Sequence, residues 1–212
     1  MEKKQTTGAT GTRRRGGRGA RERILKAAAE LFYEEGIHAT GVARLAEKAE
    51  VSSRTFYQHF PSKNALVEEY LKTFDEQISR NFDELLNGSG LSPQEQLLSV
   101  FNKVAEDPMT PSAASVMRGC PFHNAAVEAA GSMPDVTGLV QRYKQRFVER
   151  LADIAAEAGA QDPQHLGWQL AVLVEGATAL STSLDSDRPG HAAVEAARVL
   201  IHNAVPSTPT PR

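Results

Sequence analysis

The stretch TGVARLAEKAEVSSRTFYQHFPSKNAL, residues 40–66, decides the fold of this 212-residue chain. It predicts two short helices across a tight turn, followed by the beginning of a third helix. Apolar side chains recur at the helical period from Val42 to Ala49, which predicts that the first of these helices buries one face. Such a pair is a helix-turn-helix, the unit that places one helix in the major groove of DNA.

The second helix of the pair presents two different faces. Ser52 is expected to cap it, and Phe56 and Phe60, one helical turn apart, are expected to be buried together. The opposite face carries hydrogen-bonding side chains and no carboxylate: Ser53, Arg54, Tyr57 and Gln58. Arginine and glutamine can bond bidentately to base edges, whereas tyrosine and serine reach phosphate oxygens, so this face suits DNA.

A third helix is expected directly after the motif. Pro61 ends the preceding helix, and Ser62 is expected to cap a new one whose free N–H groups lie beside Lys63. A phosphate would be well placed there.

The run from Arg21 to Leu66 resembles the DNA-binding domain of the TetR/AcrR family of bacterial transcriptional regulators. The residues that carry the resemblance are Ile24, Leu25, Ala28, Leu31, Phe32, Gly36, Thr40, Leu45, Ala46, Ala49, Val51, Ser52, Thr55, Tyr57, Gln58, His59, Phe60, Lys63 and Leu66. The resemblance implies a three-helix DNA-binding domain over residues 20–66, with the helix-turn-helix at 41–60. One departure is Glu50, at a turn position where the family usually has a small residue, often glycine. A left-handed conformation at this turn would cost a non-glycine residue about 1 kcal/mol.

The expected DNA contacts lie on this domain and on the arm before it. They are Thr40, Ser52, Ser53, Arg54, Thr55, Tyr57, Gln58, His59 and Lys63, with Arg13, Arg14, Arg15 and Arg18. The arm, residues 1–19, is rich in Gly and Thr and is expected to be disordered alone. Its arginines are expected to add DNA affinity by counterion release, and a solubilising tail is the alternative interpretation.

Beyond residue 66 the pattern predicts only helices, so the fold class is all-α. Residues 67–204 are expected to form a helical effector-binding and dimerisation domain, and residues 205–212 a flexible tail. One long helix from residue 62 ends before the NGSG segment at 87–90. Further helices are expected over 93–106, 113–130, 135–158, 164–184 and 190–204, with Gly- and Pro-containing breaks between them.

Two of these helices carry apolar seams that suit association. An a/d spacing joins Leu166, Leu170, Leu173, Ala177, Leu180 and Leu184. A similar seam on the preceding helix includes Val140, Tyr143, Phe147 and Leu151. An intramolecular core is the alternative, whereas the family resemblance implies a four-helix bundle with a second copy. A homodimer with recognition helices about 34 Å apart could read a palindromic operator in double-stranded DNA.

The resemblance also implies an effector pocket in the second domain, for a small and mostly apolar molecule. Bulky candidates for its lining are Phe82, Phe101, Met117, Phe122, His123, Tyr143, Phe147 and Trp168. Most such side chains are expected to be core, because a helical domain must fill its interior. His123 and Trp168 are favoured for the pocket, since each adds a polar group to an apolar wall.

Other classes of function find little support in the composition. No apolar run reaches the length of about 18 residues that suggests a membrane span, and the N-terminus lacks a signal-peptide pattern, so a cytoplasmic location is expected. The single cysteine, Cys120, excludes an internal disulfide, and with His123 it supplies too few ligands for zinc. No catalytic residue, metal or cofactor is therefore expected. The resemblance implies a dimeric transcriptional regulator, a repressor that a small effector releases from its operator. The alternative is a DNA-binding architectural or scaffold protein that binds no ligand.

Overall fold

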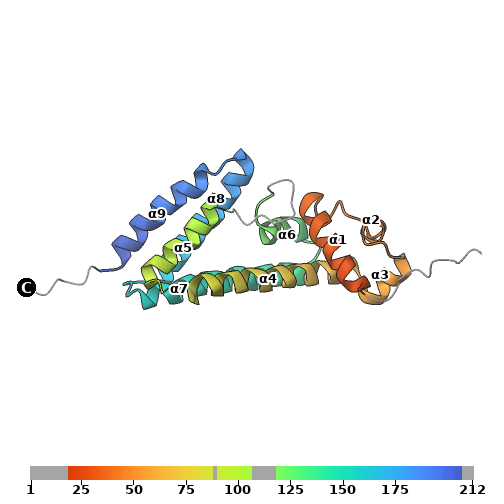
Figure 1. Ribbon diagram of the computed structural model, residues 1–212, viewed down its shortest axis with the longest axis horizontal. Coiled ribbons are helices and arrows are strands. Elements are labelled where there is room, and N and C mark those ends of the chain that lie inside the picture. Colours follow the sequence, from red (N-terminus) through yellow and green to blue (C-terminus); the bar gives the residue numbers. More distant parts are fainter. Residues whose placement is uncertain (1–18, 88–89, 107–117, 207–212) are drawn as a thin grey trace, which may run out of the picture.

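The computed structural model of the chain describes residues 19–87, 90–106 and 118–206. Every regular element in these ranges is an α-helix, which confirms the expected all-α class (Figure 1). The four arginines of the basic arm, Met117 and residues 207–212 lie outside the described residues.

The N-terminal end of the molecule consists of α1 (Ala20–Glu34), α2 (Val42–Lys48) and α3 (Ser53–His59). Helix α1 buries Ile24, Ala28 and Leu31, which recur at helical spacing and face the same apolar cluster as α3. Helices α2 and α3 are the predicted helix-turn-helix.

The remaining helices are α4 (Lys63–Asn87), α5 (Pro93–Glu106), α6 (Pro121–Ala129), α7 (Pro134–Glu157), α8 (Pro163–Leu184) and α9 (Arg188–Ala204). Their bounds agree with the expected helices to within two residues, except that the helix expected over 113–130 begins at Pro121 within the described residues. Proline stands in the first turn of α6, α7, α8 and α9, where its missing N–H breaks no intrahelical bond.

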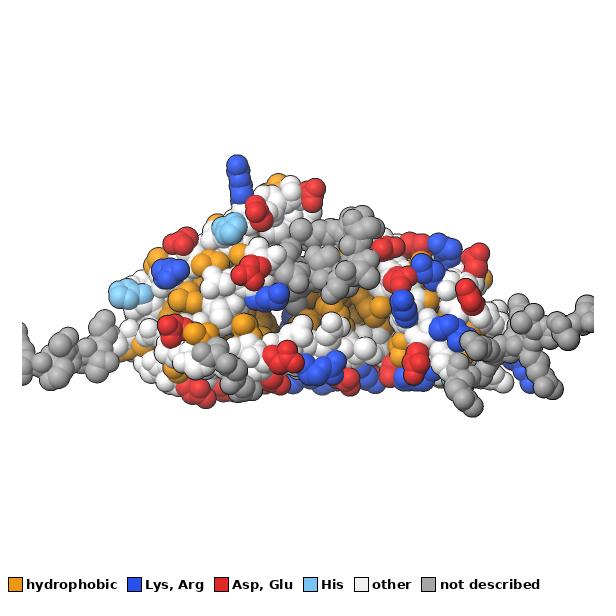
Figure 2. Space-filling view, in the orientation of Figure 1, with side chains coloured by type: hydrophobic (Ala, Val, Ile, Leu, Met, Phe, Trp, Pro, Cys, Tyr) orange, Lys and Arg blue, Asp and Glu red, His pale blue; other side chains and the backbone are white. Residues whose placement is uncertain are grey.

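Helices α4 and α7 lie side by side along the molecule and run in the same direction (Figure 1). Two ion pairs join them, Asp75 with Arg146 and Asp83 with Arg150. Figure 2 shows acidic and basic side chains mixed along the edge that these two helices form. Helix α4 therefore connects the helix-turn-helix end to the rest of the molecule.

Buried apolar side chains form two clusters. The first joins α1, α2, α3 and the first part of α4 to α6 and the first part of α7. The second joins α5, the rest of α7, α8 and α9. Gly190 allows α9 to approach α5 closely, because a Cβ there would lie 2.8 Å from the Cα atom of Ala105. The expected domain boundary after residue 66 lies within α4, and the first cluster continues across it.

Candidate functional site

The turn between α2 and α3 is a Schellman motif with glutamate in the position that usually holds glycine. The N–H of Val51 donates to the carbonyl of Ala46 at 2.9 Å, and the N–H of Glu50 donates to that of Glu47 at 3.0 Å. Glu50 has φ 52°, in the left-handed region. The Arg23 side chain adds a bond to the carbonyl of Ala49 at 3.0 Å. These bonds hold α3 at a defined angle to α2.

Helix α3 divides into a buried face and an exposed face, as its sequence predicts. Phe56 and Phe60 are buried, with ring centroids 6.2 Å apart. Ser52 caps the helix, because its Oγ accepts the N–H of Thr55 at 3.1 Å. The exposed face carries Ser53, Arg54, Tyr57 and Gln58, and Thr55 and His59 are half-buried beside it. Four hydrogen-bonding side chains without a carboxylate thus project from a rigid helix.

The start of α4 offers a second polar position close to α3. The Oγ of Ser62 accepts the N–H of Ala65 at 3.1 Å, which caps the helix as predicted. Lys63 is half-buried, and its Nζ donates to the carbonyl of His38 at 3.5 Å. Burial lowers the pKa of Lys63, and the Glu128 carboxylate opposes that shift. The ammonium therefore has a backbone partner within the chain.

The structure corrects the expectation that Thr40 contacts DNA. Its side chain is fully buried, and its Oγ1 donates to the carbonyl of Gly36 at 2.7 Å and lies 3.3 Å from that of Leu31. The Thr40 hydroxyl thus stabilises the loop after α1. Its role is structural, and its side chain is not available to DNA.

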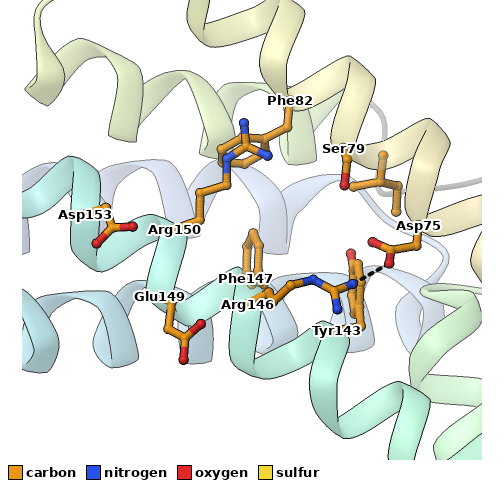
Figure 3. Close-up of a pocket in the computed structure, with 10 residues that line it drawn as sticks. Asp75, Ser79, Phe82, Tyr143, Arg146, Phe147, Glu149, Arg150 and Asp153 are labelled. Atoms are coloured by element: carbon orange, nitrogen blue, oxygen red, sulfur yellow. Dashed lines mark hydrogen bonds and ion pairs between the residues drawn. The ribbon is translucent and has the colours of Figure 1, made fainter.

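Three of the eight candidate pocket residues meet at one groove. Phe82, Tyr143 and Phe147 line a groove of about 310 Å³ between α4 and α7 (Figure 3). Charged side chains share the lining: Asp75, Arg146, Glu149, Arg150 and Asp153. The guanidinium of Arg150 lies 4.3 Å from the centroid of the Phe82 ring, and Figure 3 shows the two stacked. The groove is amphipathic, so it differs from the mostly apolar pocket that was expected.

The other candidates among the described residues lie elsewhere. Phe101 and Phe122 are fully buried, the first in the second cluster and the second stacked on Tyr143 with ring centroids 3.6 Å apart. Trp168 is 52% exposed on α8, so it is not a pocket wall in the single chain. His123 lines a separate cavity of about 230 Å³ between the start of α6 and α8. Only the groove residues therefore share a site.

The expected seam on α7 and α8 is divided by the structure. Val140, Tyr143 and Leu151 of α7 are buried within the chain, and so are three residues of the α8 seam: Leu166, Leu170 and Ala177. Leu180 and Leu184 are 53% and 64% exposed. The expectation that the α7 seam meets a second copy is therefore wrong for its buried residues, because they fill the core of their own chain.

The exposed apolar surface of α8 includes two residues that the a/d spacing missed. Trp168 is one of them, and Val172 is 65% exposed. Together with Leu180 and Leu184 they form what we call the α8 stripe, since they recur at multiples of four residues. The clue in the sequence was that Glu175 is the only charged residue of this helix, which leaves both of its faces apolar.

Neither a metal centre nor a membrane span emerges from the described residues. They contain no group of three or more His, Cys, Asp or Glu side chains placed to hold a metal ion. No described helix combines the length and the apolar character needed to cross a bilayer. Cys120 is buried, and burial raises the pKa of its thiol.

Comparison with known proteins places the helix-turn-helix in a described family. Residues 24–70 match the model of "Bacterial regulatory proteins, tetR family". The HTH-type transcriptional repressor KstR2 of Mycolicibacterium smegmatis is 35% identical over 81 residues, which are 38% of this chain and 39% of that protein. The HTH-type transcriptional regulator UidR of Escherichia coli is 35% identical over 68 residues, 32% of this chain and 35% of UidR. These curated relatives are thus matched over less than half of their length.

The similarity of structure extends over most of the chain. A TetR-family transcriptional regulator from Streptomyces coelicolor aligns with a TM-score of 0.78 and 27% identity, covering 88% of this chain and 96% of that one. The family and the relatives named here are regulators, which supports the expectation that the chain is not an enzyme.

Proposed function

We propose that this chain, which belongs to the TetR family of bacterial regulatory proteins, is a homodimeric regulator of transcription that binds a palindromic operator and is released by a small effector. The observation that carries the proposal is the exposed face of α3, on which Arg54 and Gln58 lie one turn apart with no carboxylate between them. Side chains of this kind read base edges in a major groove. Ser53, Tyr57 and Lys63 are the residues proposed to contact phosphate oxygens, with His59 and Thr55 at the margin.

Dimerisation is supported by the character of α8. A helix that is apolar all round is normally buried all round. One face of α8 packs on α7 and α9, whereas the α8 stripe is exposed in the single chain. Val199 of α9, which packs beside α8, is also 57% exposed. We propose that α8 and α9, in place of α7 and α8, meet the same helices of a second copy. One recognition helix reads few base pairs, so a dimer also explains how a palindrome is specified.

The groove between α4 and α7 is the proposed effector site. Its walls combine the aromatic rings of Phe82, Tyr143 and Phe147 with charged groups, so an amphipathic molecule fits it better than a purely apolar one. Occupation of the groove would separate Arg146 from Asp75 and Arg150 from Asp83, the two ion pairs between the helices. Because α4 leads directly from α3, such a displacement changes the position of the recognition helix. Coupling of about 1 to 3 kcal/mol is sufficient.

Repression is the proposed sign of regulation, since KstR2 is described as a repressor. The second candidate function is an architectural DNA-binding protein, favoured only by the basic arm, which suits binding without base preference. Selection of bound fragments from a random DNA pool separates the two. The proposed regulator selects one palindrome, whereas an architectural protein enriches no sequence and loses binding steeply as salt rises.

A further inference from the structure

The cavity between the start of α6 and α8 is a second candidate binding site, distinct from the α4–α7 groove. Polar side chains line it on both sides, Arg118, His123 and Asn124 on one and Glu175, Thr182 and Ser183 on the other, and apolar surface that includes Cys120 and Ala179 lies between them. At about 230 Å³ it lies below the range of about 300 to 1,000 Å³ that is usual for drug-sized ligands. A ligand for it is therefore small and forms many hydrogen bonds.

The backbone of the segment before α6 lies close against α8. Gly119 has φ 74°, and a Cβ at this position would lie 2.7 Å from the Oγ1 of Thr182. The side-chain amide of Asn124 donates to the carbonyl of Arg118 at 2.9 Å. The close approach needs glycine at position 119, and the Asn124 bond holds the carbonyl of Arg118 at the start of α6.

The charges around the cavity favour an anion. Glu175 is paired with the ammonium of Lys144, which also lies 3.7 Å from the Sγ of Cys120. Arg118, in contrast, pairs with no carboxylate among the described residues, and its guanidinium donates to the backbone carbonyl of Glu34 at 2.6 Å. A guanidinium carries five N–H donors in a fork that matches a carboxylate, so this one bond leaves donors for a ligand.

The α8 wall is suited to accept hydrogen bonds. The hydroxyl of Thr178 donates to the carbonyl of Val174 at 2.9 Å, that of Thr182 to the carbonyl of Thr178 at 2.9 Å, and that of Ser183 to the carbonyl of Ala179 at 2.8 Å. Each hydroxyl has one proton and two lone pairs, so each is left as an acceptor. Hydroxyl groups on a ligand are the donors that complement this wall.

From these observations we infer that the α6–α8 cavity binds a small hydroxylated carboxylate, with the carboxylate on Arg118 and the hydroxyl groups towards Thr182 and Ser183. The site connects directly to α1. The backbone N–H of Arg118 donates to the hydroxyl of Tyr33 at 2.8 Å, and its guanidinium holds the carbonyl of Glu34. A carboxylate is a stronger acceptor than a carbonyl, so the ligand draws the guanidinium away from the end of α1. Figure 1 shows α6 beside α1, at the helix-turn-helix end.

Binding is tested on the full chain without DNA. Lactate, threonate and gluconate, three hydroxy acids of increasing length, are each compared with the corresponding uncharged alcohol: propane-1,2-diol, threitol and glucitol. Calorimetric titration and thermal unfolding should show binding of at least one acid and of none of the alcohols. Arg118→Gln should weaken that binding by at least about tenfold, the effect of a hydrogen bond to a charged group. Arg142→Gln, on the exposed side of α7, is the matched control and should leave it unchanged.

Ser183→Ala gives a second test, because this exposed side chain can lose its hydroxyl without disturbing the packing; it should weaken binding by about threefold to tenfold. The proposal is overturned if no acid binds, if the alcohols bind equally well, or if binding survives in both variants.

The link to α1 rests on the proposed function and predicts that the bound acid lowers operator affinity. Operator binding by the free chain with no binding of any acid would overturn this inference alone, whereas acid binding without a preferred DNA sequence would overturn the proposed function alone.

Discussion

Replacement of Glu50 by glycine should stabilise the chain, because Glu50 holds a left-handed conformation with φ 52° in the turn between α2 and α3. A non-glycine residue in that conformation costs about 1 to 2 kcal/mol. Glycine removes this cost but loses about 0.5 to 1 kcal/mol more backbone entropy on folding. The middle values of these two ranges give a net gain of about 0.75 kcal/mol. For a chain of this size that corresponds to a rise in melting temperature of about 1 to 4 °C.

Two further variants separate strain from charge at the same position. Glu50→Ala keeps the strained conformation and removes the carboxylate, and Glu50→Gln keeps the strain and most of the side chain. Thermal unfolding followed by circular dichroism should show a higher melting temperature for Glu50→Gly than for either. The reasoning about strain is refuted if the glycine and alanine variants melt at the same temperature.

The same three variants also measure the influence of the Glu50 carboxylate on DNA. The carboxylate is exposed at the turn that precedes α3, where it repels phosphates. All three variants should bind the selected operator more tightly at low salt, and the gain should shrink as salt rises. A gain confined to Glu50→Gly would instead indicate that the angle between α2 and α3 limits binding.

Three other perturbations distinguish the roles proposed for single residues. Arg54→Ala should relax base preference at one or two operator positions by about 1 to 3 kcal/mol, whereas Lys63→Ala should weaken binding to all sequences alike, as competition binding to mismatched operators will show. Thr40→Val should lower the free energy of unfolding by about 1 kcal/mol, measured in urea, without altering the preferred sequence, because its hydroxyl bonds only within the chain. Val172→Lys should yield monomers in sedimentation experiments, and Val127→Lys, at an equally exposed site on α6, should not; dimers of the first variant would exclude the α8 stripe as the interface.

Local features of the helix-turn-helix could be predicted from the sequence because they depend on neighbours in the chain. The caps at Ser52 and Ser62 each need only an N–H three residues later, and both bonds form as predicted. The burial of Phe56 beside Phe60 follows from helical geometry alone. Thr40 was misassigned because a threonine hydroxyl can bond either to the backbone of a loop or to DNA. Only its burial distinguishes these two roles.

Which face of α8 is internal could not be predicted, for a physical reason. Because both faces are apolar, the leucine seam lies along the border between them: Leu166 and Leu170 face the core, and Leu180 does not. Periodicity finds the spacing of a stripe but not the direction in which it points. The seam on α7 was ambiguous in the same way, and the long-range contacts that bury Tyr143 under Phe122 decided it.

The first apolar cluster explains how either proposed site could act on the recognition helix. It extends from Phe56 of α3 to Tyr143 of α7 without a break at the expected domain boundary. Close-packed interiors transmit small displacements, since side chains cannot move without disturbing their neighbours. Tyr143 also lines the α4–α7 groove, and Cys120, in the same cluster, lines the α6–α8 cavity. Both sites therefore share a wall with the core that holds α3, and ligands in the two sites should change each other's affinity as well as that of DNA.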